Sequence, residues 1–269
     1  MISAYRCPLL QTDGFILIWL GQLAALVVEP TFTLEHLDRS ITFATPSDLA
    51  LIRARSVLTK EPGTIAWIDS FALGESMWDV GANVGPYSLY AAVFREARVL
   101  AIEPAAHNYY LLNRNIALNH MDGRVKALCL ALDRQDRFGD LNMQDQQFAS
   151  ALHAFGEAID YKSEPFTPTF TQGSLGMSAD SLLTLGAFRP DHVKIDVDGL
   201  ERAVVAGAVE VLSGCRTALV ELDLRDDEEV REITLAMKAC GMIRDREVPG
   251  NAPRPLNGAL IYNMVFRRP

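Results

Sequence analysis

The sequence predicts an α/β fold in which helices cover both faces of a mostly parallel sheet. From residue 77 onward, short apolar runs alternate with segments of helical periodicity, as expected for such a sheet. A glycine turn at residues 81–85 joins the first apolar run to the first helical segment. With 269 residues, the chain has room for one well-buried domain and an appendage.

Residues 1–76 show no clear alternation of strands and helices, and we expect them to form an N-terminal appendage that serves either substrate binding or dimerisation. Within it, a helix is predicted over Leu49–Leu58. Ser47 or Asp48 can cap its first turn, and the sequence Glu61-Pro62-Gly63 is expected to end it.

The domain itself is predicted to span residues 77–269. Its expected strands are Met77–Val80, Val99–Ile102, Val125–Leu130, His192–Ile195, Ala218–Leu222 and Leu260–Phe266. Its expected helices are Tyr87–Arg95, Asn108–Asn119, Leu200–Leu212 and Asp227–Cys240. The rhythm breaks after the third strand, where the stretch of about 134–178 is rich in Thr and Pro. We interpret it as an acceptor-binding insertion near the mouth of the cofactor cleft.

Charge and cysteine content limit the partners and the location. With 25 Lys and Arg against 34 Asp and Glu, the chain would repel a phosphate backbone, so nucleic acid is not an expected partner. The four cysteines have no zinc-site spacing and are predicted to be free thiols in the cytoplasm. The apolar segment Phe15–Val28 is too short to span a membrane and lacks a basic cluster before it, so we expect it to be a buried helix or strand, with peripheral membrane contact as the alternative. The sequence is compatible with a homo-oligomer and does not specify the oligomeric state.

The turn Asp79-Val-Gly-Ala-Asn-Val-Gly85 is expected to hold a cofactor. A strand runs into it, and Pro86 suits the first turn of the helix that follows. A dinucleotide turn would need glycine where Asn83 stands, and no P-loop or Tyr-x-x-x-Lys pair occurs in the chain, which disfavours an oxidoreductase. A nucleoside without phosphates, S-adenosyl-L-methionine, fits better. The predicted cofactor-binding residues of the turn are Asp79, Gly81, Ala82, Asn83 and Gly85.

Further cofactor contacts are predicted around this turn. Glu103 ends the second strand, where its carboxylate can accept hydrogen bonds from both ribose hydroxyls. Asp79 is the candidate for the ammonium of the methionine part. Asp133 either approaches the adenine amino group or is an ordinary turn aspartate, and Tyr87 either lies over the methionine part or packs in the core.

The turn, the Ile102-Glu103-Pro104 segment with Asn108 after it, and the block Val193–Gly199 together resemble the FkbM family of methyltransferases. The resemblance covers roughly Met77–Asp223, and the family has Glu where this chain has Asp198. It implies a Rossmann-like class I methyltransferase fold with a seven-stranded sheet, S-adenosyl-L-methionine as donor, and transfer to a hydroxyl oxygen of a sugar or another small molecule. It also implies a cofactor-binding role for Asn108.

The block His192–Gly199 carries the predicted catalytic residues. If the chain stays extended, Lys194, Asp196 and Asp198 lie on the same side of it, and such charges are costly to bury unless they pair or bind a ligand. Asp196 or Asp198 is expected to be the base, and Lys194 to hold the aspartates or to favour the developing alkoxide. Two alternatives remain: a structural ion pair, or a divalent ion held by both aspartates and Glu221.

The sequence therefore predicts an S-adenosylmethionine-dependent O-methyltransferase that acts on a hydroxyl of a saccharide or another small molecule. The alternative is a non-catalytic nucleoside-binding or interaction module on the same fold. Methyl transfer to any acceptor separates the two.

Overall fold

The structure is a computed structural model, and it describes residues 29–160, 162 and 164–269. The apolar segment Phe15–Val28 lies outside the described residues. Thr31–Pro269 form one compact unit. The second half of the predicted appendage is therefore part of the same unit as the domain, and it is built from elements of its own. No helix in the described part of the chain is long and apolar enough to cross a membrane.

A central sheet runs through this unit in the order β12-β14-β11-β10-β3-β4-β5, and β13 pairs with β14. The strands are β3 (Ser76–Val80), β4 (Arg98–Ile102), β5 (Val125–Leu128), β10 (His192–Ile195), β11 (Thr217–Asp223), β12 (Ile243–Asp245), β13 (Arg254–Leu256) and β14 (Ala259–Arg267). The pairs from β5 to β11 are parallel, and β14 is antiparallel to its neighbours. The predicted strands are confirmed, each within two residues of the observed bounds.

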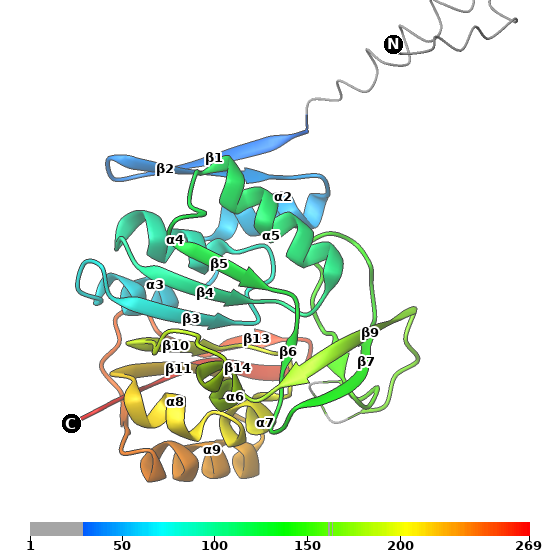
Figure 1. The fold of residues 1–269 in the computed structure, drawn as a ribbon, viewed down its shortest axis with the longest axis vertical. Helices are drawn as coiled ribbons and strands as arrows, with labels where there is room; N and C mark the ends of the chain where they lie inside the picture. Colours follow the sequence, from blue (N-terminus) through cyan, green and yellow to red (C-terminus); the bar gives the residue numbers. More distant parts are fainter. Residues whose placement is uncertain (1–28, 161, 163) are drawn as a thin grey trace, which may run out of the picture. The chain divides into compact units, whose positions relative to one another are not determined.

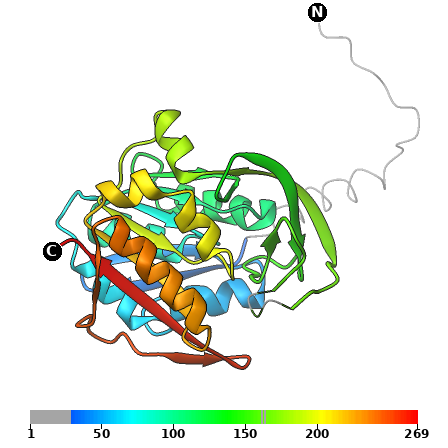
Figure 2. The same cartoon turned by 90° about the horizontal axis from the view of Figure 1, so that it is seen from below.

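Helices cover both faces of this sheet. One face packs on α4 (Pro86–Phe94) and α5 (Ala106–Leu118), and the other on α6 (Ala179–Thr184), α7 (Glu201–Ala206), α8 (Val209–Gly214) and α9 (Asp227–Ala239). Figure 1 shows α8 and α9 at the lower end of the drawing, and Figure 2 shows the same layers from below. The α/β class and Rossmann-like fold are confirmed, whereas the central sheet of the described residues has eight strands and not the seven that the resemblance implies.

The predicted helix Leu200–Leu212 was wrong in one respect, because the chain forms α7 and α8 with a break at Gly207. The Gly207 carbonyl accepts a hydrogen bond from the Asp180 amide. A Cβ at Gly207 would lie 2.2 Å from the Asp133 carbonyl oxygen, so the chain turns where only glycine fits against that neighbour.

Residues 31–69 contribute a hairpin and two helices: β1 (Thr31–His36), β2 (Arg39–Ala44), α2 (Asp48–Ser56) and α3 (Pro62–Asp69). Ser47 caps α2, as expected, by accepting a hydrogen bond from the Ala50 amide at 3.1 Å. The segment Glu61-Pro62-Gly63 does not end a helix but begins α3, with Pro62 in its first turn. Asn115 of α5 accepts a hydrogen bond from the Ala44 amide at 2.8 Å, which ties β2 to the domain.

The stretch 134–178, the predicted insertion, forms most of a second, smaller sheet. Its strands β7 (Arg137–Met143), β8 (Ala154–Phe155) and β9 (Phe170–Met177) join β6 (Ala131–Leu132) in the order β6-β9-β7-β8. Gly139 and Gly176 make room for the Phe155 ring, since a Cβ at either position would lie within 2.9 Å of it. The segment of residues 145–153 between β7 and β8 accepts hydrogen bonds from Asn83 of the glycine turn and from Asn108 of α5, and it is called the strap below.

Candidate active site

A cavity of about 330 Å³ opens at the carboxyl ends of β3, β4, β10 and β11. The chain leaves β3 toward β4 and β5, and later returns to place β10 on the other side of β3. Open parallel sheets bind ligands where the strand order reverses in this way. Of the predicted site residues, the cavity is lined by Gly81, Asn83, Glu103, Asn108, Asp196 and Asp198. The others, Asp79, Ala82, Gly85, Tyr87, Asp133 and Lys194, are not among the lining residues.

The glycines of the turn are required by the protein's own packing. Gly81 has φ +80°, and a Cβ there would lie 1.7 Å from the Asp196 carbonyl oxygen. Gly85 has φ +83°, and its Cβ would lie 2.5 Å from Leu112 Cδ1. Both positions therefore demand glycine because β3 approaches the end of β10 and α4 approaches α5. The expected close approach to a ligand is not needed to explain either residue.

Glu103 presents a fixed carboxylate to the cavity. Its Oε2 accepts a hydrogen bond from the Asn83 amide at 2.8 Å, and its Oε1 accepts one from the Ala105 amide at 2.9 Å. Burial raises the pKa of Glu103 to about 7, against the effect of these two donors. The Asn108 side chain also lowers this pKa as a hydrogen-bond donor. A carboxylate has about four acceptor sites, so these donors leave part of its capacity for a ligand.

Asn108 holds the strap. Its Oδ1 accepts a hydrogen bond from the Ala149 amide at 2.8 Å, and its Nδ2 donates to the Ser150 carbonyl at 2.9 Å. Asn83 Nδ2 donates to the same carbonyl at 2.7 Å. Both ends of the Asn108 amide are thus occupied by the strap, and this residue positions one wall of the cavity.

A buried ion cluster lies behind the cavity. The Lys194 side chain is 1% exposed, and its Nζ lies 2.7 Å from Asp196 Oδ2 and 3.9 Å from Asp79 Oδ1. Asp79 also accepts a hydrogen bond from Ser88 at 2.6 Å, and burial raises its pKa against the charge of Lys194. The Tyr87 ring lies 5.2 Å from Lys194 Nζ. Asp79 and Tyr87 therefore belong to this buried cluster, and the contact of Asp79 with the ammonium of the methionine part stays a prediction.

Asp196 and Asp198 do not share one side of an extended strand, because β10 ends at Ile195 and Asp198 has φ +57°. Burial alone would raise the pKa of Asp196, but Lys194 and Lys60 hold it well below its ordinary value. Burial and the charge of Asp196 raise the pKa of Asp198 to about 6. The Asp198 carboxylate accepts a hydrogen bond from the Leu152 amide of the strap at 2.7 Å.

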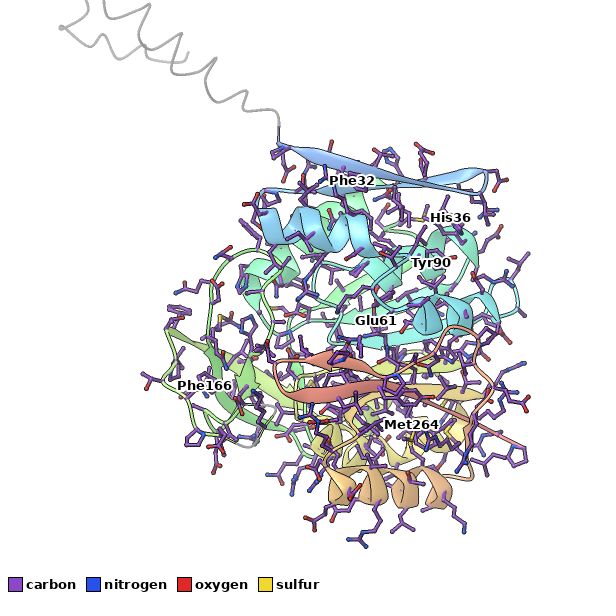
Figure 3. All side chains as sticks on the ribbon, turned by 180° about the vertical axis from the view of Figure 1, so that it is seen from behind. Phe32, His36, Glu61, Tyr90, Phe166 and Met264 are labelled. Atoms are coloured by element: carbon purple, nitrogen blue, oxygen red, sulfur yellow. The ribbon has the colours of Figure 1, made fainter. Side chains whose placement is uncertain are left out.

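Charged residues also line the cavity where Lys60, Glu221 and Arg254 meet, and of these three Glu221 alone belongs to a sequence hypothesis. Glu61 is buried beside β14 (Figure 3), where it pairs with Lys60 at 2.8 Å and with Arg254 at 3.0 Å. Arg254 also pairs with Glu221. Burial and the charge of Asp196 raise the pKa of Glu221 well above its ordinary value. Only tertiary contacts between α3, β13 and β11 bring these residues together.

Carboxylate oxygens of Glu61, Asp196 and Glu221 lie within 4.8 Å of one another, a set that differs from the sequence hypothesis by containing Glu61 and lacking Asp198. Oxygen ligands in this number can hold a divalent ion. Here Lys194 and Arg254 already neutralise them.

The far end of the cavity is apolar, lined by Leu130, Leu132, Leu141 and Phe155 from β6, β7 and their surroundings. Asp133 lies beside this end but is engaged elsewhere. Its Oδ2 accepts a hydrogen bond from Arg137 at 2.5 Å, and its Oδ1 accepts one from the Arg134 amide at 2.8 Å. The geometry thus presents Asp133 as a structural turn aspartate, the alternative reading of the sequence.

Comparisons with known proteins agree with this architecture. The chain is 49% identical over 51 residues to methyltransferase sdnD from Sordaria araneosa, which is 19% of this chain and 20% of that protein. It is 26% identical over 151 residues to the hexuronic acid methyltransferase AglP from Haloferax volcanii, 54% of this chain and 55% of that one. The chain thus matches about a fifth and about half of the length of these relatives.

A solved structure, methyltransferase FkbM from Methylobacillus flagellatus, shares the fold with a TM-score of 0.52 at 14% identity, over 82% of this chain and 55% of that chain. The model of the methyltransferase FkbM domain matches residues 79–243, from the glycine turn to β12 and more than half of the chain. The chain therefore belongs to the FkbM family of methyltransferases.

Proposed function

We propose that this methyltransferase uses S-adenosyl-L-methionine to methylate a hydroxyl oxygen of a saccharide or another small molecule. The observation that carries the donor assignment is Glu103, a buried carboxylate that lines the cavity at the end of β4 and keeps acceptor capacity beyond its bonds to the chain. The relative named a hexuronic acid methyltransferase supports a saccharide acceptor.

The cavity suits two parts of this donor, the adenine ring and the ribose. Leu130, Leu132 and Phe155 offer apolar surface to an adenine ring, and Glu103 offers acceptors to the two ribose hydroxyls. When bound, the donor supplies an electrophilic methyl group on a sulfonium. The remaining work of the protein is to align the acceptor oxygen and to take its proton.

Asp198 is the better candidate for the base. A general base works best when its pKa lies near the operating pH, and the pKa of Asp198 is raised to about 6. Asp196 is held ionised by Lys194, so it accepts a proton poorly but can orient a hydroxyl by accepting a hydrogen bond. In the proposed reaction the acceptor oxygen forms the new bond to the methyl carbon, the carbon–sulfur bond breaks, and the hydroxyl proton passes to Asp198.

Alignment of the acceptor oxygen with the methyl group is expected to contribute most to the rate enhancement. Holding an acceptor oxygen in line with the methyl group can lower the barrier by ~7–11 kcal/mol. The strap supports this alignment, because Leu152 holds Asp198 while Asn83 and Asn108 hold Ser150.

Calorimetry with S-adenosyl-L-methionine and NAD tests the donor without knowledge of the acceptor. We expect binding of the former only, and a Glu103→Gln variant that binds it about 10- to 100-fold more weakly, as expected for lost hydrogen bonds to a charged group. Glu35→Gln, at an exposed position on β1, is the matched control. Tighter binding of NAD, or equal donor affinity in both variants, would remove the ribose assignment.

A further inference from the structure

The part of the cavity around the proposed base, lined by Asp196, Asp198, Glu221 and Arg254, is called the acceptor end below. Arg53 stands out among the cations of this end. It lies on α2, lines the cavity and is half-buried. Its Nε donates to the Ala149 carbonyl of the strap at 2.6 Å, which fixes the side chain. Its two terminal nitrogens have no carboxylate partner within the described part of the chain.

The other three cations of this region are all paired. Lys60 lies 2.8 Å from Glu61, and Lys194 lies 2.7 Å from Asp196. Arg254 pairs with both Glu61 and Glu221. Among the described residues, the guanidinium of Arg53 therefore has no ion-pair partner, in contrast to the other three cations.

The position of Arg53 relates it to the proposed base. Its charge opposes the rise in the pKa of Asp198, so the two groups are close enough to interact. Leu49 and Ile52 of α2 line the cavity beside it, and Leu256 lines the cavity from β13. An acceptor in this region would meet apolar surface, a base and one unpaired cation.

We infer that Arg53 determines acceptor specificity by binding an acidic group, a carboxylate or a phosphate, on the molecule whose hydroxyl is methylated. A guanidinium held at Nε keeps its terminal N–H groups in a planar fork, which suits either anion. The donor carries a positive sulfonium, so donor binding adds positive charge to this end of the cavity and further favours an anionic acceptor. The inference rests on the proposed function.

Matched acceptors test it. Methyl glycosides of glucose, galactose and mannose are offered beside the corresponding uronic acids and 6-phosphates, with methyl-labelled donor, and kcat/KM is measured for each. We expect an acidic member of at least one set to be methylated about 10-fold or more faster than its neutral counterpart. Preference for the uronic acid or for the phosphate identifies the acidic group.

The Arg53→Gln variant is expected to lower the ratio of acidic to neutral kcat/KM toward one, and Arg53→Lys to give an intermediate ratio because lysine keeps the charge but not the fork. A purely structural role through the strap would slow both acceptors and leave the ratio unchanged. Arg55→Gln is the control, since Arg55 lies on the same helix, is exposed and does not line the cavity.

Two results would overturn the inference while donor binding still supports the proposed function: no labelling of any acidic member, or an unchanged ratio in Arg53→Gln. Release of the label by mild alkali would reveal a methyl ester. The acid would then be the reacting group, which contradicts both the anchoring role and the hydroxyl acceptor. Absence of donor binding would instead refute the proposed function.

Discussion

Replacement of the buried Lys194 by methionine is expected to destabilise the protein by about 3–5 kcal/mol, because it leaves two carboxylates without their cation. The Lys194 Nζ lies 2.7 Å from Asp196 and 3.9 Å from Asp79. With an effective dielectric constant of about 20, these contacts correspond to about 6 and about 4 kcal/mol of attraction. Desolvation of the three groups offsets much of this, so loss of one partner costs less than the sum.

Urea denaturation at several pH values measures the effect. In the native protein the pKa of Asp196 is depressed below its value in the unfolded chain. Ionised Asp196 therefore stabilises the fold fully at pH values above the unfolded pKa, and this stabilisation is lost as the pH falls through the folded pKa. Without Lys194, burial raises the pKa of both carboxyls, and the variant gains stability as the pH falls. The difference between the proteins should therefore be larger at pH 8 than at pH 5.

The control is Lys126→Met, an exposed lysine on β5 for which a change within about 0.5 kcal/mol is expected. A loss below about 1 kcal/mol for Lys194→Met, or a loss independent of pH, would refute the reasoning that the cluster is a compensated buried charge.

Three further predictions concern the cavity wall and the base. Turnover should rise with pH through an apparent pKa of about 6, and a pH–rate profile of Asp198→Asn that keeps this inflection would exclude Asp198 as the base. Gly81→Ala should lower the free energy of unfolding by about 3 kcal/mol, measured by heat or urea, because its Cβ would clash with the Asp196 carbonyl oxygen. Gly74→Ala, at φ +82° with nothing within 4 Å, should lower it by about 1 kcal/mol. Equal losses of stability in the two variants would contradict the clash at Gly81. Asn108→Ala should speed amide exchange in the strap about 10-fold, and unchanged exchange would show that other contacts hold it.

Local sequence patterns predicted the central sheet well because its strands are short apolar runs flanked by polar turns. They did not reveal the β6-β9-β7-β8 sheet, where β9 reads Phe-Thr-Gln-Gly-Ser-Leu-Gly-Met and lacks an alternating pattern. Its glycines serve the Phe155 ring, a contact between segments far apart in sequence. Pro62 was predicted to follow the end of a helix, whereas it begins α3. The local sequence does not separate the two cases, because proline occurs both after a helix end and in a first helical turn.

The site was predictable where a motif fixed it and not where tertiary contacts did. Glu103 follows directly from its place at a strand end, and it lies at the cavity. Asp79 occupies an equally suggestive place, but its side chain is turned toward Lys194 and Ser88. The sequence shows that a charged residue ends a strand. The direction of its side chain depends on residues of neighbouring elements, here Lys194 and Ser88. Arg53 and Arg254 lie outside every motif, and only packing of α2 and β13 places them at the cavity.

The two aspartates of the β10 block are neighbours with opposite environments, and their titrations are connected through Lys194. Lys194 keeps Asp196 ionised, and the negative charge of Asp196 is one cause of the raised pKa of Asp198. Without Lys194 the pKa of Asp196 rises, and wherever this carboxyl is protonated its charge no longer raises the pKa of Asp198. A folded Lys194→Met enzyme should therefore show its pH–rate inflection below that of the native enzyme. An unshifted inflection would mean that the buried cluster stabilises the fold without tuning the base.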